Sequence, residues 1–204
     1  MYNNKKMTNR YRKALETKQR IFECAVKLFS DRGYKNVSVD DIILESNSSK
    51  GAFYNHFSSK NQIIMEGFKQ IDQYYEEFFA SISSEISSVK RLQLFINECF
   101  NVINNQVGLE NISIVYSTQI ENLDDNKYLL DKNRNLYKII EKIIYEGQEN
   151  NEIKKNFLSK DISIMLITLI RGVVYDWCLN KGKFKLGNYG NQIISIFVNS
   201  ILED

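Results

Sequence analysis

The chain has 204 residues, of which 43% are hydrophobic and 12% aromatic, so it can bury a sizeable core and a wholly disordered chain is excluded. It contains no Pro and only 9 Gly, the two main helix breakers, which predicts an all-α fold. The formal net charge is +2, but the first sixty residues carry 12 Lys and Arg against 6 Asp and Glu, so a basic head precedes a mildly acidic body.

The cysteine pattern and the hydropathy of the chain indicate a cytoplasmic protein. Cys24, Cys99 and Cys178 are far apart and odd in number, which argues against a disulfide framework or a zinc site and indicates buried thiols. Residues 1–20 are polar and basic, unlike a signal peptide. The longest apolar run, residues 162–179, contains two charged residues and is expected to be a core helix rather than a membrane span. We therefore expect no metal, no cofactor and no membrane contact.

The chain begins with a basic arm over residues 1–14. Its cations suit the phosphates of a nucleic acid, although a solvated tail fits the same residues equally well. They are Lys5, Lys6, Arg10, Arg12 and Lys13. Apolar residues then recur at helical spacing from Thr17 to Arg32, which predicts the first helix, and Gly33 supplies its stop.

Two short helices joined by a tight turn are predicted next. Ser38 is a good N-cap for a helix over residues 39–45, and Ser49 for a second helix that ends near residue 55 or 56. Asn47, between them, tolerates the left-handed backbone that the turn needs. Residues 38–57 therefore have the spacing of a helix-turn-helix unit, although short helix pairs also occur as plain packing motifs.

The remainder of the chain is predicted to be a helical bundle. A long helix begins near Lys60 after a cap at Ser58 or Ser59. Amphipathic periodicity predicts helices at about 60–84, 88–106, 125–149, 159–180 and 188–203, with a weaker one near 110–119.

The segment from Thr17 to Ile63 resembles the DNA-binding domain of the TetR/AcrR family of bacterial one-component transcriptional regulators. Its most specific part is the run SKGAFYNHF from Ser49 to Phe57. The resemblance implies a three-helix DNA-binding domain over residues 15–75, with its helix-turn-helix motif at 38–57, and a ligand-sensing and dimerisation domain over residues 76–204. Ser48 stands where the family usually has Val, which predicts a looser turn.

The second short helix of this motif has the chemistry of a recognition helix. Small residues at its N-terminus let the backbone approach the groove, and polar side chains further along reach base edges or phosphates. Lys60, a cation at a helix N-terminus, suits a phosphate. His56 could instead be a structural residue, and Tyr54 a half-buried core aromatic. The residues predicted to contact DNA are Ser38, Ser49, Lys50, Gly51, Ala52, Tyr54, Asn55, His56 and Lys60.

The body is expected to hold a small-molecule effector, because this is what the resemblance implies for that domain. The candidate lining is aromatic, although aromatic residues at helical spacing are more often ordinary core. The candidates are Phe79, Phe95, Phe100, Tyr116, Tyr137, Tyr175 and Trp177. The helices near 159–180 and 188–203 are apolar on more faces than a monomer needs, and they are expected to form a homodimer interface.

The resemblance thus implies a homodimeric regulator, most simply a repressor, that an unknown small molecule releases from a palindromic operator in double-stranded DNA. An enzyme is the main alternative, but a single His, scattered Cys and no nucleophile–base pair leave no catalytic set. A third alternative, a structural protein that has lost DNA binding, conflicts with the intact run at 49–57.

Overall fold

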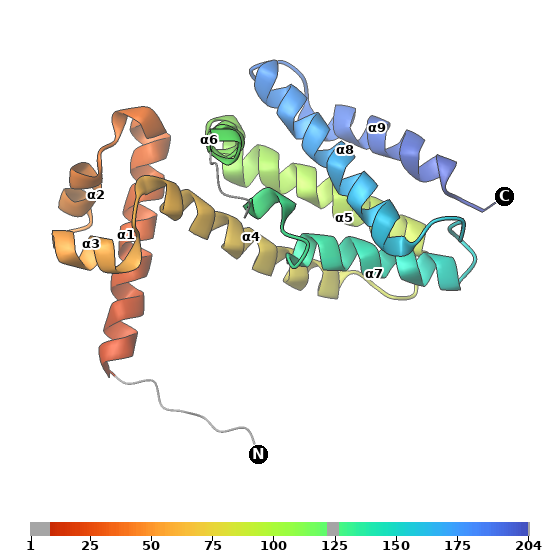
Figure 1. The fold of residues 1–204 in the computed structure, drawn as a ribbon, viewed down its shortest axis with the longest axis horizontal. Coiled ribbons are helices and arrows are strands. Elements are labelled where there is room, and N and C mark those ends of the chain that lie inside the picture. The colour runs from red at the N-terminus through yellow and green to blue at the C-terminus, as the bar shows by residue number, and fades with distance from the viewer. Residues whose placement is uncertain (1–8, 122–126, 204) are drawn as a thin grey trace. The chain divides into compact units, whose positions relative to one another are not determined.

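The computed structural model describes residues 9–121 and 127–203, where regular structure is helical apart from one isolated bridge between Ile153 and Leu202 (Figure 1). The predicted all-α fold is therefore confirmed. The chain divides into two compact units, the first ending at Gly67 and the second beginning at Phe68. This boundary lies inside the continuous helix α4 (Lys60–Ser81), whereas the boundary expected after residue 75 lies further along the same helix.

The first unit is built around one long helix. α1 (Asn9–Arg32) packs against α2 (Val39–Glu45) and α3 (Lys50–His56), and a short 3-10 turn, η1 (Tyr34–Asn36), lies between α1 and α2. Gly33 ends α1 as predicted, because its φ of 78° is a conformation that glycine adopts without steric cost. The core of the unit is apolar and almost fully buried; it includes Ile21, Ala25, Phe29, Val37, Ile42, Phe53, Phe57 and Ile63.

The start of α1 corrects the predicted start at Thr17, because the helix already begins at Asn9. The added turns contain residues of high helix propensity, and Arg12 pairs with Glu16 one turn further along. They bury no apolar face, so hydrophobic periodicity could not indicate them. The basic arm is therefore helical at Arg10, Arg12 and Lys13, while Lys5 and Lys6 lie outside the described residues.

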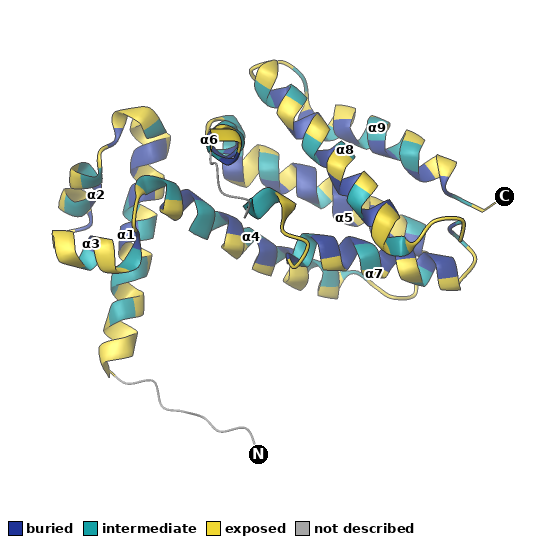
Figure 2. Cartoon of the chain, in the orientation of Figure 1, coloured by how far each residue is buried: buried dark blue, intermediate teal, exposed yellow. Residues whose placement is uncertain are grey.

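The second unit is a helical bundle that contains the rest of α4. It comprises α5 (Ser88–Val102), α6 (Gly108–Glu121), α7 (Asn135–Glu149), α8 (Ser159–Leu179) and α9 (Leu186–Ser200). α8 packs against α7 and α9, and α5 packs against the same two helices. Each of α5, α7 and α8 has buried and exposed faces (Figure 2), as expected for amphipathic helices around a shared core.

The predicted helix over residues 125–149 is wrong over residues 127–134, since α7 begins only at Asn135, and residues 125 and 126 lie outside the described residues. Before it, the N–H of Asn133 donates to the carboxylate of Asp131 at 2.9 Å, which makes a local turn. Arg134 then has an extended backbone and serves as the N-cap of α7. A 3-10 turn, η3 (Tyr128–Leu130), precedes this turn.

The predicted helix over residues 88–106 also differs, because α5 passes into a π-helical turn, η2, over Ile103–Val107. The turn ends at Gly108, whose φ of 76° suits glycine. Such turns make a local bulge in a helix and often lie at functional sites. Ile103 in this turn borders the cavity described below.

α8 is the one helix of the described segments that is long and apolar enough to cross a membrane, judged by length and composition alone. It packs against α7 and α9, and its side chains at Leu166, Ile170 and Val174 are buried there. These contacts support the interpretation of residues 162–179 as a core helix.

Candidate functional site

The start of α2 is fixed by reciprocal hydrogen bonds. The hydroxyl of Ser38 accepts from the N–H of Asp41 at 3.1 Å, and the carboxylate of Asp41 accepts from the N–H of Ser38 at 2.7 Å. This capping box satisfies two backbone donors at the helix N-terminus. The hydrogen bonds from the side chain and backbone of Ser38 hold the pKa of Asp41 below its usual range.

The turn between α2 and α3 is held by polar contacts. Asn47 adopts the predicted left-handed backbone, with φ 46°. The hydroxyl of Ser48 lies 2.9 Å from the buried hydroxyl of Ser46, and the guanidinium of Arg20 donates to the Ser46 carbonyl at 2.9 Å. Hydrogen bonds therefore hold the turn that was predicted to be looser because Ser48 stands where the family usually has Val.

α3 has one face in the core and one face in solvent. Ser49 caps it by accepting from the N–H of Ala52 at 3.1 Å. Phe53 and Phe57 are buried, with ring centroids 6.2 Å apart, and they fix the rotation of the helix about its axis. On the other face Lys50, Gly51, Tyr54 and Asn55 are exposed, and Ala52 and His56 are half-buried. Nothing lies within 4 Å of a Cβ built on Gly51, so the backbone there is open to a close approach.

Lys60 has a role in the fold of the first unit that the sequence did not indicate. Its ammonium donates to the carbonyl oxygens of Tyr34, at 2.8 Å, and Val37, and it lies 4.3 Å from the centroid of the Tyr34 ring. Burial lowers the pKa of Lys60. The ammonium therefore ties η1 to the start of α4, where Ser59 supplies the predicted cap by accepting from the N–H of Gln62.

A small cavity of about 50 Å³ lies in the second unit. It is bordered by α4, the π-helical turn η2, α6, η3, the start of α7, and α8. Of the aromatic residues proposed from the sequence, Tyr116 borders this cavity. Its lining consists of Phe68, Ile71, Tyr75, Ile103, Ile112, Tyr116, Leu129, Arg134, Leu136, Ile167, Ile170, Arg171 and Val174.

The other proposed aromatic residues lie away from this cavity. Phe79 and Phe95 pack edge to face at 6.2 Å, and Tyr175 is exposed beside Tyr116. Phe100 is fully buried against Gly190, where a Cβ would lie 2.5 Å from its ring. The two remaining residues are tied to backbone carbonyls: the hydroxyl of Tyr137 donates to Leu129 at 3.3 Å, and the indole N–H of Trp177 donates to Phe184 at 3.0 Å.

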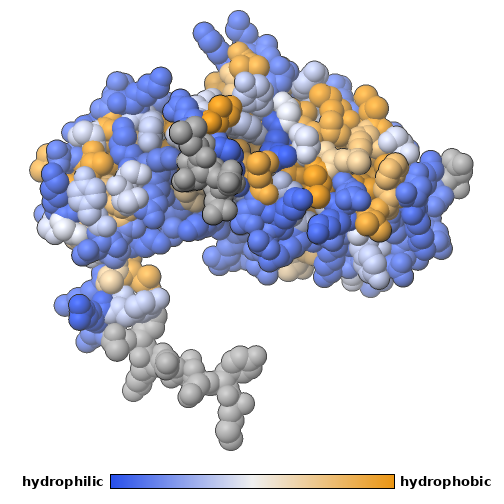
Figure 3. Space-filling view, in the orientation of Figure 1, coloured by the Kyte–Doolittle hydropathy of each residue, from blue (hydrophilic) through white to orange (hydrophobic). Residues whose placement is uncertain are grey.

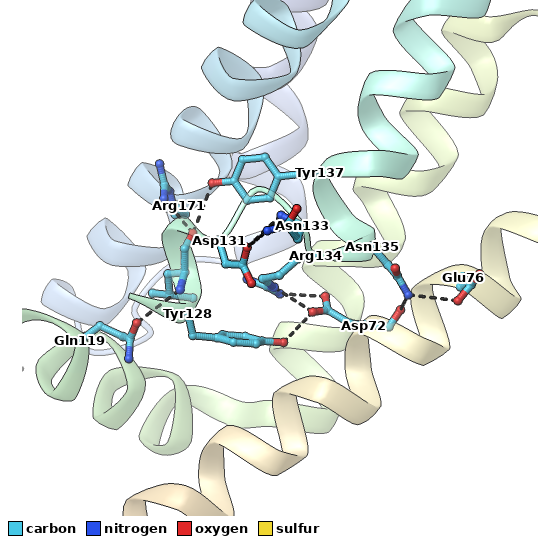
Figure 4. Close-up of polar contacts among 11 residues, drawn as sticks. Asp72, Glu76, Gln119, Tyr128, Asp131, Asn133, Arg134, Asn135, Tyr137 and Arg171 are labelled. Carbon is cyan, nitrogen blue, oxygen red and sulfur yellow. Dashed lines mark hydrogen bonds and ion pairs between the residues drawn. The ribbon is translucent and has the colours of Figure 1, made fainter. Parts of the chain in front are cut away.

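A buried polar network lies beside the cavity and reaches its wall through Arg134 (Figure 4). Arg134 donates two hydrogen bonds to Asp72 of α4, at 2.8 and 2.9 Å, and its guanidinium lies 4.2 Å from the ring centroid of Tyr128. The Tyr128 hydroxyl donates to the same carboxylate at 2.6 Å. Burial raises the pKa of Tyr128 above its usual value. The network ties α4 to η3 and to the start of α7.

Sequence reasoning missed this network, although one signal was present. Asp72 lies four residues after Phe68 and three before Tyr75, on the face of α4 that is buried. A carboxylate at an apolar register position needs a buried partner. The sequence could have indicated that requirement, but it could not have identified Arg134 as the partner.

The capped helix pair, the left-handed turn and the exposed polar face of α3 define a helix-turn-helix transcriptional regulator. Comparison with known proteins gives its family. Residues 21–66 match the model of the bacterial regulatory proteins of the tetR family, and residues 68–200 match the C-terminal region of YsiA-like proteins. The chain belongs to the TetR family of bacterial DNA-binding transcriptional regulators.

Relatives over nearly the full length are regulators too. The chain is 26% identical over 186 residues to the fatty acid metabolism regulator protein of Bacillus subtilis (strain 168), covering 89% of this chain and 93% of the relative. It is 27% identical over 196 residues to the transcriptional repressor DhaR of Mycobacterium sp. (strain GP1), covering 91% and 92%.

Solved structures share the fold. The FadR repressor of Thermus thermophilus, in complex with lauroyl-CoA, superposes with a TM-score of 0.76 at 16% identity, covering 92% of this chain and 96% of that one. FadR of Bacillus subtilis, in complex with stearoyl-CoA, gives a TM-score of 0.63 at 22% identity, covering 90% and 98%.

Proposed function

We propose that the protein represses transcription by binding a palindromic operator as a homodimer, and that a small molecule bound in the second unit releases it. DNA binding is supported mainly by the two faces of α3. One face is anchored in the core by Phe53 and Phe57, and the other is polar and faces solvent. A rigid helix with free hydrogen-bonding side chains is what readout of the major groove requires.

Each proposed DNA contact has a distinct role. Lys50, Tyr54, Asn55 and His56 reach base edges or phosphates, and Gly51 and Ala52 permit close approach of the backbone. The hydroxyl of Ser49 accepts the capping hydrogen bond and still has a proton to donate to a phosphate. The hydroxyl of Ser38 donates its proton to Asp41, so it reaches a phosphate by exchanging that hydrogen bond. Lys60 keeps a third ammonium donor beyond its two carbonyl contacts, and this donor can bind a phosphate.

The proposed dimer interface is formed by α8 and α9. Hydrophobic residues gather on the surface over these helices (Figure 3), which an isolated protomer would leave in water. Exposed apolar side chains there include Met165, Tyr175, Leu179, Tyr189 and Ile196. A twofold axis through this surface would pair it with its own copy.

The proposed effector carries a long apolar chain, and the cavity of the second unit receives it. The lining is mainly aliphatic and aromatic, and two structural relatives are bound to acyl-CoA thioesters. The effector lowers operator affinity by binding the released state more tightly than the DNA-bound state. The family is a regulatory one, so we propose no enzymatic activity for this protein. We also propose that it acts in the cytoplasm, where its operator lies.

Electrophoretic retardation at physiological salt tests this function. The purified protein is mixed with the DNA upstream of its own gene, and a scrambled fragment of equal length is the control. We expect retardation of the first fragment at protein concentrations that leave the second free, and reversal on addition of a ligand with a long apolar chain, for which lauroyl-CoA and sodium dodecanoate are the probes. Equal binding to both fragments would contradict operator recognition, and retardation without reversal would contradict only the effector.

A further inference from the structure

The wall of the cavity carries an unbalanced positive charge. Arg134 and Arg171 both border it, and the other lining side chains are uncharged. Arg134 is paired with Asp72. Arg171 donates only to neutral acceptors, the carbonyl of Leu129 at 2.9 Å and the hydroxyl of Thr168 at 3.1 Å. In the described part of the chain no carboxylate lies within ion-pair distance of Arg171, so one charge remains unneutralised.

A cation beside an apolar cavity favours an anion as the occupant, because desolvation strengthens their attraction. Arginine also presents a planar fork of donors that matches a carboxylate. We propose that the cavity binds an amphipathic monoanion: its carboxylate pairs with Arg171 and Arg134, and its apolar chain lies along the hydrophobic lining. The inference rests on the proposed function, because it names the chemical class of the effector.

Asp72 is the internal competitor of this ligand. Its carboxylate is held by two hydrogen bonds from Arg134 and one from Tyr128, the arrangement that a carboxylate ligand would itself adopt (Figure 4). Asp72 is only 8% exposed, so losing Arg134 would leave a buried charge without a cation. An unpaired buried charge is strongly unfavourable. A ligand whose carboxylate replaces Asp72 as the partner of Arg134 therefore favours a movement of Asp72, and of α4, away from the cavity.

The size of the cavity requires such a movement. Its volume of about 50 Å³ is well below the roughly 300–1,000 Å³ of a typical ligand pocket, so the wall must open for a chain to enter. The ion pair between Asp72 and Arg134 holds α4 to the start of α7, together with hydrogen bonds from Asn135 to Asp72 and Glu76. Because α4 continues into the first unit, exchanging this pair for the ligand links occupancy of the cavity to the helix that leads to the DNA-binding motif.

The test uses the full-length protein and three probes that share a twelve-carbon chain: sodium dodecanoate, 1-dodecanol and lauroyl-CoA. Calorimetry measures binding, and fluorescence anisotropy of labelled operator DNA measures release. Arg171→Gln removes the surplus charge while keeping a donor for Leu129. Arg91→Gln is the matched control, because Arg91 is an arginine of the same unit that pairs with Glu146 and does not border the cavity. Asp72→Asn removes the internal competitor.

We expect dodecanoate to bind the wild-type protein more tightly than dodecanol does. Arg171→Gln should lower the affinity for dodecanoate by about tenfold, which corresponds to the loss of one hydrogen bond to a charged group. Binding of dodecanol should be unchanged in this variant, and Arg91→Gln should bind both probes as wild type does. Asp72→Asn, once circular dichroism shows that it is folded, should bind dodecanoate more tightly.

Other outcomes overturn the inference. Equal binding of acid and alcohol, or an Arg171→Gln variant with wild-type affinity for dodecanoate, would show that the cavity has no anion subsite. If lauroyl-CoA alone binds and releases DNA, unaffected by Arg171→Gln, the proposed function stands and this inference fails. If the protein fails to bind its operator at all, the proposed function fails first.

Discussion

Tyr54 is the most direct test of the α3 surface, because half of the residue is exposed and its ring packs on Phe53 only at one edge. Truncation in Tyr54→Ala should weaken operator binding by about 1–3 kcal/mol and relax preference at one position of each half-site. The melting temperature should barely change, since surface substitutions usually stay within about 0.5 kcal/mol. Anisotropy titrations against operator variants measure the effect. Tyr54→Phe separates the hydroxyl from the ring, and wild-type binding by both variants would remove Tyr54 from the interface.

Lys60 combines a structural and a proposed DNA-binding role, and two measurements separate them. Lys60→Gln should lower the free energy of unfolding by about 1–3 kcal/mol, because the carbonyls of Tyr34 and Val37 lose a charged donor. If the ammonium also neutralises a phosphate, the slope of log affinity against log salt should flatten by about one unit. Lys50→Gln, at an exposed position, is the control and should change the slope alone. A stable Lys60→Gln with a flattened slope would refute the structural role.

The limits of sequence reasoning are clearest for single residues. The caps at Ser38 and Ser49 could be predicted because a cap involves residues two or three apart in the chain. Cavity lining could not, because it depends on which face of each helix meets which neighbour. Aromatic residues such as Phe79, Phe95 and Phe100 are typical of pocket linings, yet these three pack within the bundle and do not border the cavity.

α2 offers a pH-dependent test at the scale of one helix. The hydrogen bonds from Ser38 hold the pKa of Asp41 below its unfolded value, so they stabilise the fold wherever the carboxyl is ionised. This contribution is complete above the unfolded pKa and is lost as the pH falls through the lowered, folded value. The wild-type protein should therefore have a higher melting temperature than Asp41→Asn at neutral pH, and this difference should vanish in acid. Asp40→Asn, in the same helical turn without those hydrogen bonds, should show less of this dependence.

The contact between α5 and α9 depends on a glycine. A Cβ on Gly190 would lie between 2.5 and 2.9 Å from three ring atoms of Phe100, a fully buried side chain. Gly190→Ala should lower the free energy of unfolding by about 1–3 kcal/mol, the usual effect of overpacking. Gly187→Ala on the same helix, with nothing within 4 Å of the added Cβ, should be neutral or slightly stabilising. Urea titrations compare them, and equal stabilities would mean that Phe100 adapts without cost.

At the scale of elements, the sequence predicted which helices exist better than where they begin. In the described residues, amphipathic periodicity indicated each α-helix of the second unit, because each buries one apolar face. It missed the first turns of α1, which bury no apolar face. It also placed the start of α7 too early, in a segment where a side-chain hydrogen bond from Asn133 to Asp131 forms a turn. Polar contacts between neighbouring residues therefore determine where these helices begin, and hydropathy alone does not predict those boundaries.

Dimerisation is tested at the scale of the whole molecule. Ile196 is 73% exposed on α9, so Ile196→Asp should leave the protomer folded while placing a charge in the proposed interface. Sedimentation should show monomers, and operator affinity should fall steeply, because the two recognition helices must lie about 34–36 Å apart, or a multiple of it, to reach successive major grooves. Val173, on the other helix of the proposed interface, is buried within the protomer, so a charged residue there should unfold it. A dimeric Ile196→Asp would refute this interface.

The junction inside α4 restricts how such proteins can exchange parts. Where a flexible linker joins two units, segments of any length can be inserted. Here the boundary lies within a continuous helix, so each added or lost residue turns the following part of α4 by about 100° about the helix axis and shifts it by about 1.5 Å. A change of seven residues restores the rotation to within about 20°. Heads and bodies of related regulators are therefore interchangeable only when the crossover preserves helical phase.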